Sequence, residues 1–371
     1  MAGNELGIIF RIMSFGESHG ECVGVVIDGC PAGFPVNLEL IQNLLNKRRP
    51  GQSQVTTSRK ELDKLHIRSG IFEGKTTGAP ILMEISNEDT DSSKYEALRN
   101  TPRPSHADFP AHVRYGGNQD FRGGGRFSGR ITAGIVMAGG LALQLLDKLQ
   151  GIHIGSHVIQ VGKVKGNSVL TVQTILANRE QNAVRTADLK VAPAMEAAIQ
   201  ETRSHNDSVG GLIECIVENL PAGIGNPFFD TLEGVLAKAL FAIPAVKGVE
   251  FGAGFRCSEM KGSEHNDPYR YDGEKIVTTS NNAGGIIGGI SSGMPIVFRV
   301  AIKPTASIGR PQQSIDLKTK KNIEMKIEGR HDPCIAPRAV PVVDCIVAIV
   351  LLDQLRIAGI IPEVIRVVPP T

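Results

Sequence analysis

The stretch RGGGRFSGRITAGIVMAGGLALQLLDKL, residues 122–149, joins a glycine- and arginine-rich loop to a long apolar run. We predict that residues 131–149 form a buried helix, because most positions in this run are apolar. Ser128–Arg130 would then lie at the N-terminus of that helix, where unpaired N–H groups and the helix dipole favour an anion. The sequence therefore predicts an anion site at the start of a core helix. A flexible loop with solvated arginines is the alternative.

The segment around this loop is rich in groups that bind oxyanions. Residues 103–130 hold five arginines, two histidines and six glycines. Arginine presents a planar charged fork to phosphate or carboxylate oxygens, and glycine lets backbone N–H groups approach them. Over the whole chain, 40 Lys+Arg face 38 Asp+Glu, and the net charge is +2. This even balance favours neither nucleic acid nor a membrane, so the local charge indicates a small anionic ligand.

Length and cysteine usage narrow the class of protein. The 371 residues are 41% hydrophobic and show no linker-like change in composition, so we expect one domain over residues 1–371. Six cysteines without a CxxC pair argue against a disulfide framework or a metal site. The N-terminus shows no secretory signal, and charges at Asp344, Asp353 and Arg356 interrupt the apolar region 340–368. We therefore expect a cytoplasmic protein with no membrane span and no metal.

Apolar periodicity and turn residues predict alternating strands and helices. Asn37 is suited to cap the first helix, and Pro193 to begin a later one. Residues 87–100 are polar and are expected to form a loop, as is the polar segment 52–59. Strands are predicted over residues 6–15, 22–28, 65–72, 80–85, 152–164, 212–217, 248–252 and 296–302, and helices over 38–49, 131–149, 193–203, 230–241 and 339–355.

One short pattern occurs twice in the chain. Residues 24–33 end a predicted strand in Pro31-Ala32-Gly33, and a helix follows. Residues 212–223 end a predicted strand in Pro221-Ala222-Gly223, and again a helix follows. The repetition predicts a layered α+β fold with internal pseudo-symmetry.

Two further polar segments lie in the N-terminal part, outside the arginine-rich loop. His19 stands between glycines in the turn Gly16–Gly20, and its ordinary titration range suits proton transfer; a surface turn histidine is the alternative. Lys47, Arg48 and Arg49 end the first predicted helix. Cations at that position favour the helix dipole without any ligand, so the pattern alone does not indicate function.

Two further candidate segments lie in the C-terminal part. Residues 281–293 are glycine-rich and lead through a strand to Lys303–Ser307, where a flat ring or a phosphate could approach the backbone. Arg330, His331 and Asp332 follow one another, so two of them can face a site while the third supports the turn; a charged loop is the alternative. No spacing fits a catalytic triad, a Walker loop or a Rossmann fingerprint. Arg, Lys and His without a metal pattern indicate a doubly anionic ligand and proton transfer, beside a phosphorylated cofactor.

Taken together, these motifs resemble the chorismate synthase family, and they follow the family's order along nearly the whole chain. The motifs are Met1-Ala-Gly-Asn4, Phe15-Gly-Glu-Ser-His-Gly20, Arg48-Arg49-Pro50-Gly51, Thr56-Thr57 with Arg59, Arg103-Pro-x-His106-Ala-Asp108, Arg122-Gly-Gly-Gly-Arg126, Val246-Lys247-Gly248-Val249-Glu250, Gly284-Gly285 with Gly288-Gly289-Ile290-Ser291-Ser292-Gly293, Lys303-Pro304-Thr305 and Gly329-Arg-His-Asp-Pro-Cys334.

The resemblance implies a lyase of the shikimate pathway of aromatic amino acid biosynthesis. The family's reaction is the 1,4-anti elimination of phosphate from 5-enolpyruvylshikimate 3-phosphate to give chorismate, and it requires reduced FMN without net redox change. The family's fold is a sandwich of helices between antiparallel sheets, and its members are homotetramers. Because no reductase domain is evident, we expect an external source of reduced flavin; reduction of the flavin by the chain itself with NADPH stays open.

The resemblance also implies roles for individual residues. His19 would protonate the departing phosphate, His106 would act on the protonation of the reduced flavin, and Asp332, helped by flavin N5, would receive the substrate's ring proton. Arg48, Arg130 and Arg330 would bind the substrate's anionic groups. The FMN site would comprise Arg126, Phe127, Ser128, Pro244, Ala245, Gly288, Lys303, Pro304, Thr305, Ala306, Ser307 and Arg330.

The chain departs from the family's pattern at a few positions near these groups. They are Gln54 for arginine, Ser105 for glycine, Phe127 and Gly129 for small residues, Ile131 for glutamate and Pro244 for asparagine. Because every expected proton-transfer residue is present, we expect an active enzyme. The alternative is a protein of the same fold that binds a phosphorylated ligand without turnover.

Overall fold

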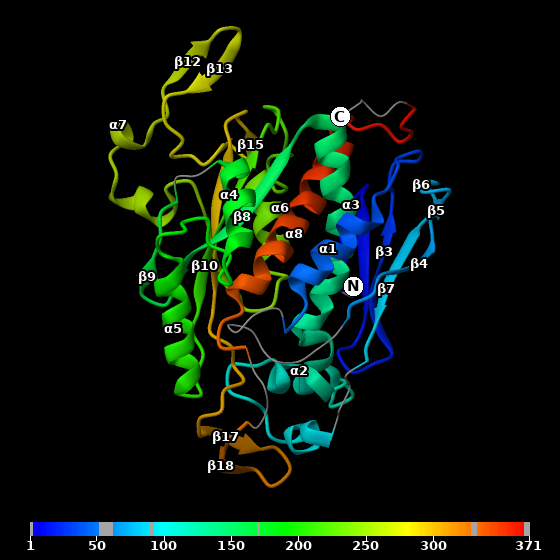
Figure 1. Cartoon of the computed structure of the whole chain (residues 1–371), viewed down its shortest axis with the longest axis vertical. Coiled ribbons are helices and arrows are strands. Elements are labelled where there is room, and N and C mark those ends of the chain that lie inside the picture. Colours follow the sequence, from blue (N-terminus) through cyan, green and yellow to red (C-terminus); the bar gives the residue numbers. More distant parts are fainter. Residues whose placement is uncertain (1–2, 52–61, 89–92, 169–170, 328–331, 367–371) are drawn as a thin grey trace.

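The computed structural model describes residues 3–51, 62–88, 93–168, 171–327 and 332–366. Within these ranges the chain forms two five-stranded antiparallel sheets with a layer of helices between them (Figure 1). The first sheet has the order β1 (Glu5–Leu6), β2 (Arg11–Gly16), β3 (Cys22–Asp28), β7 (Ile81–Ser86) and β4 (His66–Ser69). The second has the order β9 (Val164–Lys165), β8 (His153–Val161), β10 (Gly211–Glu218), β16 (Ile296–Ile302) and β11 (Val246–Phe251).

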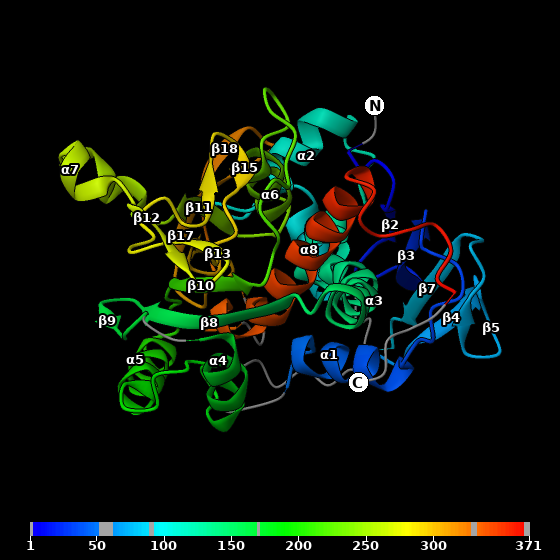
Figure 2. The ribbon, with the colours of Figure 1, turned by 90° about the horizontal axis from the view of Figure 1, so that it is seen from above.

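Two long helices form the centre of the layer between the sheets. They are α3 (Thr132–Gln150) and α8 (Ala336–Ile357). Figure 2 shows them side by side, with α3 towards the first sheet and α8 towards the second. They approach closely because Gly139 has no side chain: a Cβ there would lie 2.2 Å from Cβ of Cys345. The shorter helices α1 (Leu38–Arg48) and α6 (Leu232–Leu240) pack against this pair.

The helix predicted from the opening stretch is a core helix. Residues Gly129–Gln150, which comprise α3 and the turn before it, are long and apolar enough to cross a membrane by length and composition alone. However, 78% of their most apolar window is buried inside the protein, with the side chains packed against α8 and the first sheet. This degree of burial is expected for the central helix of a globular core.

The remaining elements lie around these layers. Figure 1 shows the β12–β13 hairpin with α7, and the β17–β18 hairpin, as projections at opposite ends of the molecule. The peripheral elements are β5 (Ile71–Phe72), β6 (Lys75–Thr76), α2 (Asp108–Tyr115), α4 (Val172–Asn178), α5 (Ala192–Ser204), α7 (Gly262–His265), β12 (Tyr269–Asp272), β13 (Lys275–Thr278), β14 (Ile286–Ile287), β15 (Ile290–Ser291), β17 (Gln312–Asp316) and β18 (Lys321–Met325). Single 3₁₀ turns are η1 (Ser93–Arg99), η2 (Arg122–Phe127), η3 (Gly129–Ile131), η4 (Arg179–Gln181) and η5 (Gly254–Glu259).

The predicted α+β class and its internal pseudo-symmetry are confirmed. Four strands of each described sheet follow an equivalent order, β2-β3-β7-β4 and β8-β10-β16-β11, with β3 and β10 at the centre. The fifth strand differs, because β1 precedes its neighbour in the chain and β9 follows it. In each half a short hairpin with two residues per strand precedes the strand that pairs with the central strand. The hairpin β5–β6 precedes β7, which pairs with β3, and the hairpin β14–β15 precedes β16, which pairs with β10. The outer strands β4 and β11 both carry a register shift where they join their neighbour.

The repeated Pro-Ala-Gly turns make the same hydrogen bonds in both halves. The hydroxyl of Thr76 donates to the Pro31 carbonyl (2.6 Å) and accepts from Phe34 N–H (3.0 Å). In the second half the Ser291 hydroxyl donates to the Pro221 carbonyl (2.6 Å) and accepts from Ile224 N–H (2.8 Å). Each turn is therefore tied to a hairpin by one buried hydroxyl.

Some predicted boundaries are wrong for reasons that lie in tertiary structure. The strand predicted over residues 6–15 is broken, because the N–H groups of Ile8, Ile9 and Phe10 donate to the buried Asp353 carboxylate on α8 instead of a neighbouring strand. Residues 93–99, expected in a loop, form η1. The first helix begins as predicted, with the Asn37 side chain accepting from two N–H groups of its first turn. The expected loop at residues 52–59 lies outside the described residues.

The Thr76 and Ser291 hydroxyls allow a test of whether the two Pro-Ala-Gly turns are equivalent. Thr76→Val and Ser291→Ala should each lower the free energy of unfolding by about 1–3 kcal/mol, because each change leaves a buried N–H without its hydroxyl acceptor and removes the hydroxyl's bond to the proline carbonyl. Thr77→Val, at an exposed position beside Thr76, is the control and should change stability little. Urea unfolding followed by circular dichroism measures the difference. Unaltered stability in either core variant would contradict the equivalence.

Candidate active site

A cavity of about 590 Å³ lies where the two halves meet. Its walls include the starts of α3 and α8, at Thr132 and Ile335, and residues at the ends of α1 and α6, at Arg48 and Phe241. The pseudo-symmetry therefore brings two helix N-termini to one space. The N-terminal dipole ends of α3 and α8 favour an anion there, and the C-terminal end of α1, which has the opposite dipole, carries the cation Arg48.

The charge of the cavity lining is predominantly positive. Among the described residues, Asp332 is the one carboxylate that lines it. The cationic side chains in the described lining are Arg48, Arg103, Arg126, Arg130, Lys247, Lys303 and Arg338. Such an excess of positive charge is expected for a site that holds several anionic groups at once.

Lys247 and Lys303 are the cations that the described lining receives from β11 and from the end of β16. Burial lowers the pKa of Lys303, and the nearby positive charge of Lys247 lowers it further. Lys247 occupies the register shift between Val246 and Gly248, and such a bulge re-aims a side chain. Lys303 Nζ donates to the Ser105 carbonyl (2.9 Å), which connects this strand end to the arginine-rich segment.

The predicted histidines lie against neighbouring glycines of the arginine-rich loop. A Cβ on Gly123 would lie 2.2 Å from Cδ2 of His19, and a Cβ on Gly124 would lie 3.3 Å from Cε1 of His106. Both glycines have φ values in the left-handed region, +58° and +85°. The loop can pass between the two imidazoles because it carries no side chains there. His19 is buried, and its ring meets the ring of Tyr95 edge to face at 5.0 Å.

A buried carboxylate connects two of the predicted substrate-binding arginines. Asp63 accepts from Arg48 Nη2 (2.6 Å) and from Arg130 Nη1, and its side chain is fully buried. Burial alone would raise the pKa of Asp63, but the charges and hydrogen bonds of both arginines hold it below its usual value. Asp63 also has φ of +49°, a strained conformation for a residue with a side chain. The arginines are therefore fixed in place, and Arg48 is not a solvated helix-end cation.

Two more cavity residues are held by specific partners. Arg338 donates through Nη1 to the Asp332 carboxylate and through Nε to the Arg48 carbonyl (3.1 Å), so Asp332 is anchored at the start of α8. Arg126 donates to the carbonyls of Ser14 (3.2 Å) and Gly16 (3.1 Å) at the end of β2. These contacts attach the glycine loop to the first sheet.

Most of the predicted site residues lie together. His19 does not line the cavity and borders it through Gly123 and Tyr95. Gly288 lies in the β14–β15 turn and is not part of the lining. Arg330 lies outside the described residues. The predicted residues in the lining are His106, Asp332, Arg48, Arg130, Arg126, Phe127, Ser128, Pro244, Ala245, Lys303, Pro304, Thr305, Ala306 and Ser307.

Sequence analysis assigned no role to Asp63, Arg338, Lys247 and Tyr95. Asp63 and Arg338 had no detectable signal, because their importance comes from contacts with residues far away in sequence. Lys247 lies in the Val246–Glu250 motif and could have been considered as an anion contact.

Removal of the Asp63 charge should destabilise the protein in a pH-dependent way. Asp63→Asn should cost about 3–5 kcal/mol at neutral pH, because two buried arginines lose their shared counter-ion. The folded pKa of Asp63 is depressed, so its stabilising effect is complete above the unfolded value of about 4 and is lost as pH falls through the folded pKa. The difference in the free energy of unfolding between the wild type and Asp63→Asn should therefore shrink below about pH 4. Urea unfolding at pH 7 and pH 3.5 measures it; a pH-independent difference would contradict the prediction.

Comparisons with known proteins agree on one family. The family model described as Chorismate synthase matches residues 10–355. A chorismate synthase of Dehalococcoides mccartyi is 53% identical over 363 residues, which cover 98% of this chain and 99% of the relative. One of Methanosarcina acetivorans is 52% identical over 361 residues, covering 97% and 98%.

A solved structure agrees with these relatives. A chain titled "Crystal Structure of Chorismate Synthase" superposes with a TM-score of 0.75 at 28% identity, and the match covers 95% of this chain and 93% of that one. Both the sequence and the fold are thus similar over almost the whole length. The chain therefore belongs to the chorismate synthase family, a family of lyases.

Proposed function

We propose that this protein eliminates phosphate from 5-enolpyruvylshikimate 3-phosphate to form chorismate, with reduced FMN bound in the cavity between α3 and α8. The observation that carries the proposal is the convergence of seven described cations, two helix N-termini and the His106 and Asp332 side chains on one cavity. The substrate has a phosphate and two carboxylates, and the flavin has another phosphate. An anionic load of this size needs such a lining.

The residues of the cavity fit a flavin nucleotide. A volume of about 590 Å³ is within the range of small-molecule and cofactor sites. Phe127 and Pro244 offer apolar surface to a flat ring, and Arg126 and Ser128 stand at the start of the core helix, where a phosphate is favoured. The like charges of Lys303 and Lys247 would be relieved by an anion between them.

In the proposed reaction the protein moves protons and stabilises departing charge. One C–H bond and the C–O bond to phosphate break at the two ends of the ring's existing double bond. The C–H electron pair forms a new double bond to the neighbouring carbon, the existing double bond shifts by one position, and the C–O pair leaves with phosphate. Reduced flavin, held by the lining residues of the cavity, would supply electron density for this bond cleavage without net redox change. Asp332, which accepts a hydrogen bond from Arg338, receives the ring proton, while His19 protonates the phosphate and Arg48 and Arg130 stabilise its charge.

Further properties of the family are proposed for this chain as well. The chain uses externally reduced flavin, acts in the cytoplasm and assembles as a homotetramer. Exposed aromatic side chains support an assembly, because Phe228 and Phe229 are 84% and 90% exposed and adjacent.

The proposal is tested by anaerobic turnover of 5-enolpyruvylshikimate 3-phosphate with purified protein and chemically reduced FMN. We expect phosphate and chorismate in equal amounts, measured by a phosphate assay and by chorismate absorbance. Binding of both ligands without product would instead identify a ligand-binding protein. That outcome would direct attention to Phe127 and Pro244, two departures from the family pattern that line the cavity.

The role of His19 can be tested both by displacing its ring and by removing it. Gly123→Ala should lower kcat by at least about 100-fold, because its Cβ would collide with the His19 ring and move a proton donor. His19→Ala should cause a loss of similar size. Gly262→Ala, at a position outside the described cavity lining where a Cβ also meets open space, is the control and should retain activity. Full activity of Gly123→Ala and His19→Ala would remove the acid role of His19.

A further inference from the structure

We propose that Asp108 is the positioning residue of this site: its carboxylate holds His106 as the Nδ1–H tautomer, so that Nε2 is the nitrogen that exchanges a proton in the cavity. The catalytic consequence of this inference rests on the proposed function. The inference adds a role for Asp108, which has none in that function. Asp108 is the first residue of α2, two positions after His106.

The geometry around Asp108 joins three side chains. Oδ1 lies 2.6 Å from His106 Nδ1 and 2.8 Å from Arg103 Nη2. Oδ2 accepts from Arg103 Nε (2.7 Å) and from the Arg103 backbone N–H (3.0 Å). Arg103 in turn donates through Nη1 to the Ser307 hydroxyl (3.2 Å). The carboxylate is therefore fixed by arginine on one side and meets the imidazole on the other.

These contacts leave one tautomer for neutral His106. Burial would raise the pKa of Asp108, but hydrogen bonds and charge from Arg103 and His106 hold it well below its usual range, so the carboxylate is ionised. An ionised carboxylate only accepts hydrogen bonds, and a contact of 2.6 Å therefore requires a proton on Nδ1. Arg103 Nη2, at 3.1 Å from the same nitrogen, cannot also donate to it. Proton exchange is left to Nε2, across the ring beside Gly124.

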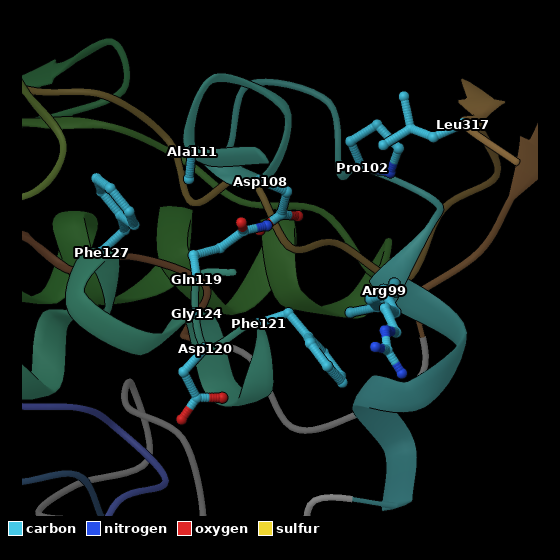
Figure 3. A pocket seen from close by; sticks show the side chains of 11 residues that line it. Arg99, Pro102, Asp108, Ala111, Gln119, Asp120, Phe121, Gly124, Phe127 and Leu317 are labelled. Atoms are coloured by element: carbon cyan, nitrogen blue, oxygen red, sulfur yellow. The ribbon is translucent and has the colours of Figure 1, made fainter. Parts of the chain in front are cut away.

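The side chains of His106 and Asp108 are partly buried, with 19% and 16% of their surface exposed. A second, small cavity of about 20 Å³ lies behind the carboxylate, and Figure 3 shows Asp108, Gln119 and Phe121 on its wall. The other charged groups on that wall are Arg99 and Asp120, and Lys303 contacts the neighbouring Ser105 carbonyl. In this partly buried setting a charge-assisted hydrogen bond is stronger than it would be at a fully exposed position.

A second aspartate–arginine pair, after α2, shows whether such a pair serves only to form a turn. Asp120 and Arg122 form the same local pair, in which the carboxylate accepts from the arginine's backbone N–H (3.0 Å), Nε (2.9 Å) and Nη2 (2.9 Å). Within the described residues this pair shows no hydrogen bond to an imidazole nitrogen, although the charge of His19 helps to lower the pKa of Asp120. An aspartate–arginine turn therefore does not need a histidine, and the additional contact at Asp108 serves His106.

The first measurement is the state of the His106 ring in the folded protein, which needs no turnover. In protein labelled with ¹⁵N-histidine, with the His106 signals assigned by their loss in His106→Gln, Nδ1 should be the protonated nitrogen of the neutral ring. Asp108→Asn should give a mixture of tautomers, because an amide can accept or donate. Protonation at Nε2 in the wild type, or unchanged signals in Asp108→Asn, would overturn the proposal.

The second measurement is a double-mutant cycle in the elimination assay. Asp108→Asn should lower kcat by about 10- to 100-fold with KM changed little, and Asp108→Glu should recover part of the loss. In a His106→Ala background, Asp108→Asn should cause no further loss; an additional loss of the same size would show a structural role and reject the proposal. Asp28→Asn, which breaks an exposed pair with Arg11, is the control for a lost carboxylate.

The two measurements also separate this proposal from the proposed function. If the wild-type protein shows no turnover, the proposed function fails, while the ring-nitrogen signals still decide the role of Asp108. If Asp108→Asn does not fold, the wild-type signals and the Asp108→Glu variant decide it.

Discussion

The packing of α3 against α8 is the contact on which the rest of the structure depends. Each helix covers one sheet, so their contact joins two halves that could not bury their apolar faces alone. The helices come this close only because Gly139 leaves room for the backbone and side chain of Cys345. The same contact fixes where the two helix N-termini meet, and thereby where the cavity lies.

Convergence of positive helix ends and cationic side chains is favourable for an anionic ligand and costly for the free protein. The structure offsets this cost with carboxylates placed beside the cations. Asp63 lies between Arg48 and Arg130, Asp332 contacts Arg338, and Asp108 contacts Arg103 as well as His106. These pairs also limit the freedom of the arginines, so fewer side chains must be ordered when a ligand binds.

Glycine conformation connects this charged wall to the proton-transfer groups. The loop of Gly123 and Gly124 passes between two imidazoles that come from distant parts of the chain, and its left-handed φ values exclude larger residues without strain. Arg126 fastens the same loop to the end of β2. The loop is thereby a rigid spacer between His19 and His106 instead of the solvated, flexible loop that was the alternative from sequence.

The sequence by itself determined the α+β class, the core helix after the glycine loop, the repeated Pro-Ala-Gly turns and most side chains of the cavity, because these depend on local periodicity, backbone preference and recognisable motifs. Tertiary structure decided the rest. Asp353 interrupts an expected strand from the far end of the chain, and Asp63 and Arg338 join the site through contacts across it. Local sequence carries no signal for such partners, since their role arises only when the two halves pack together.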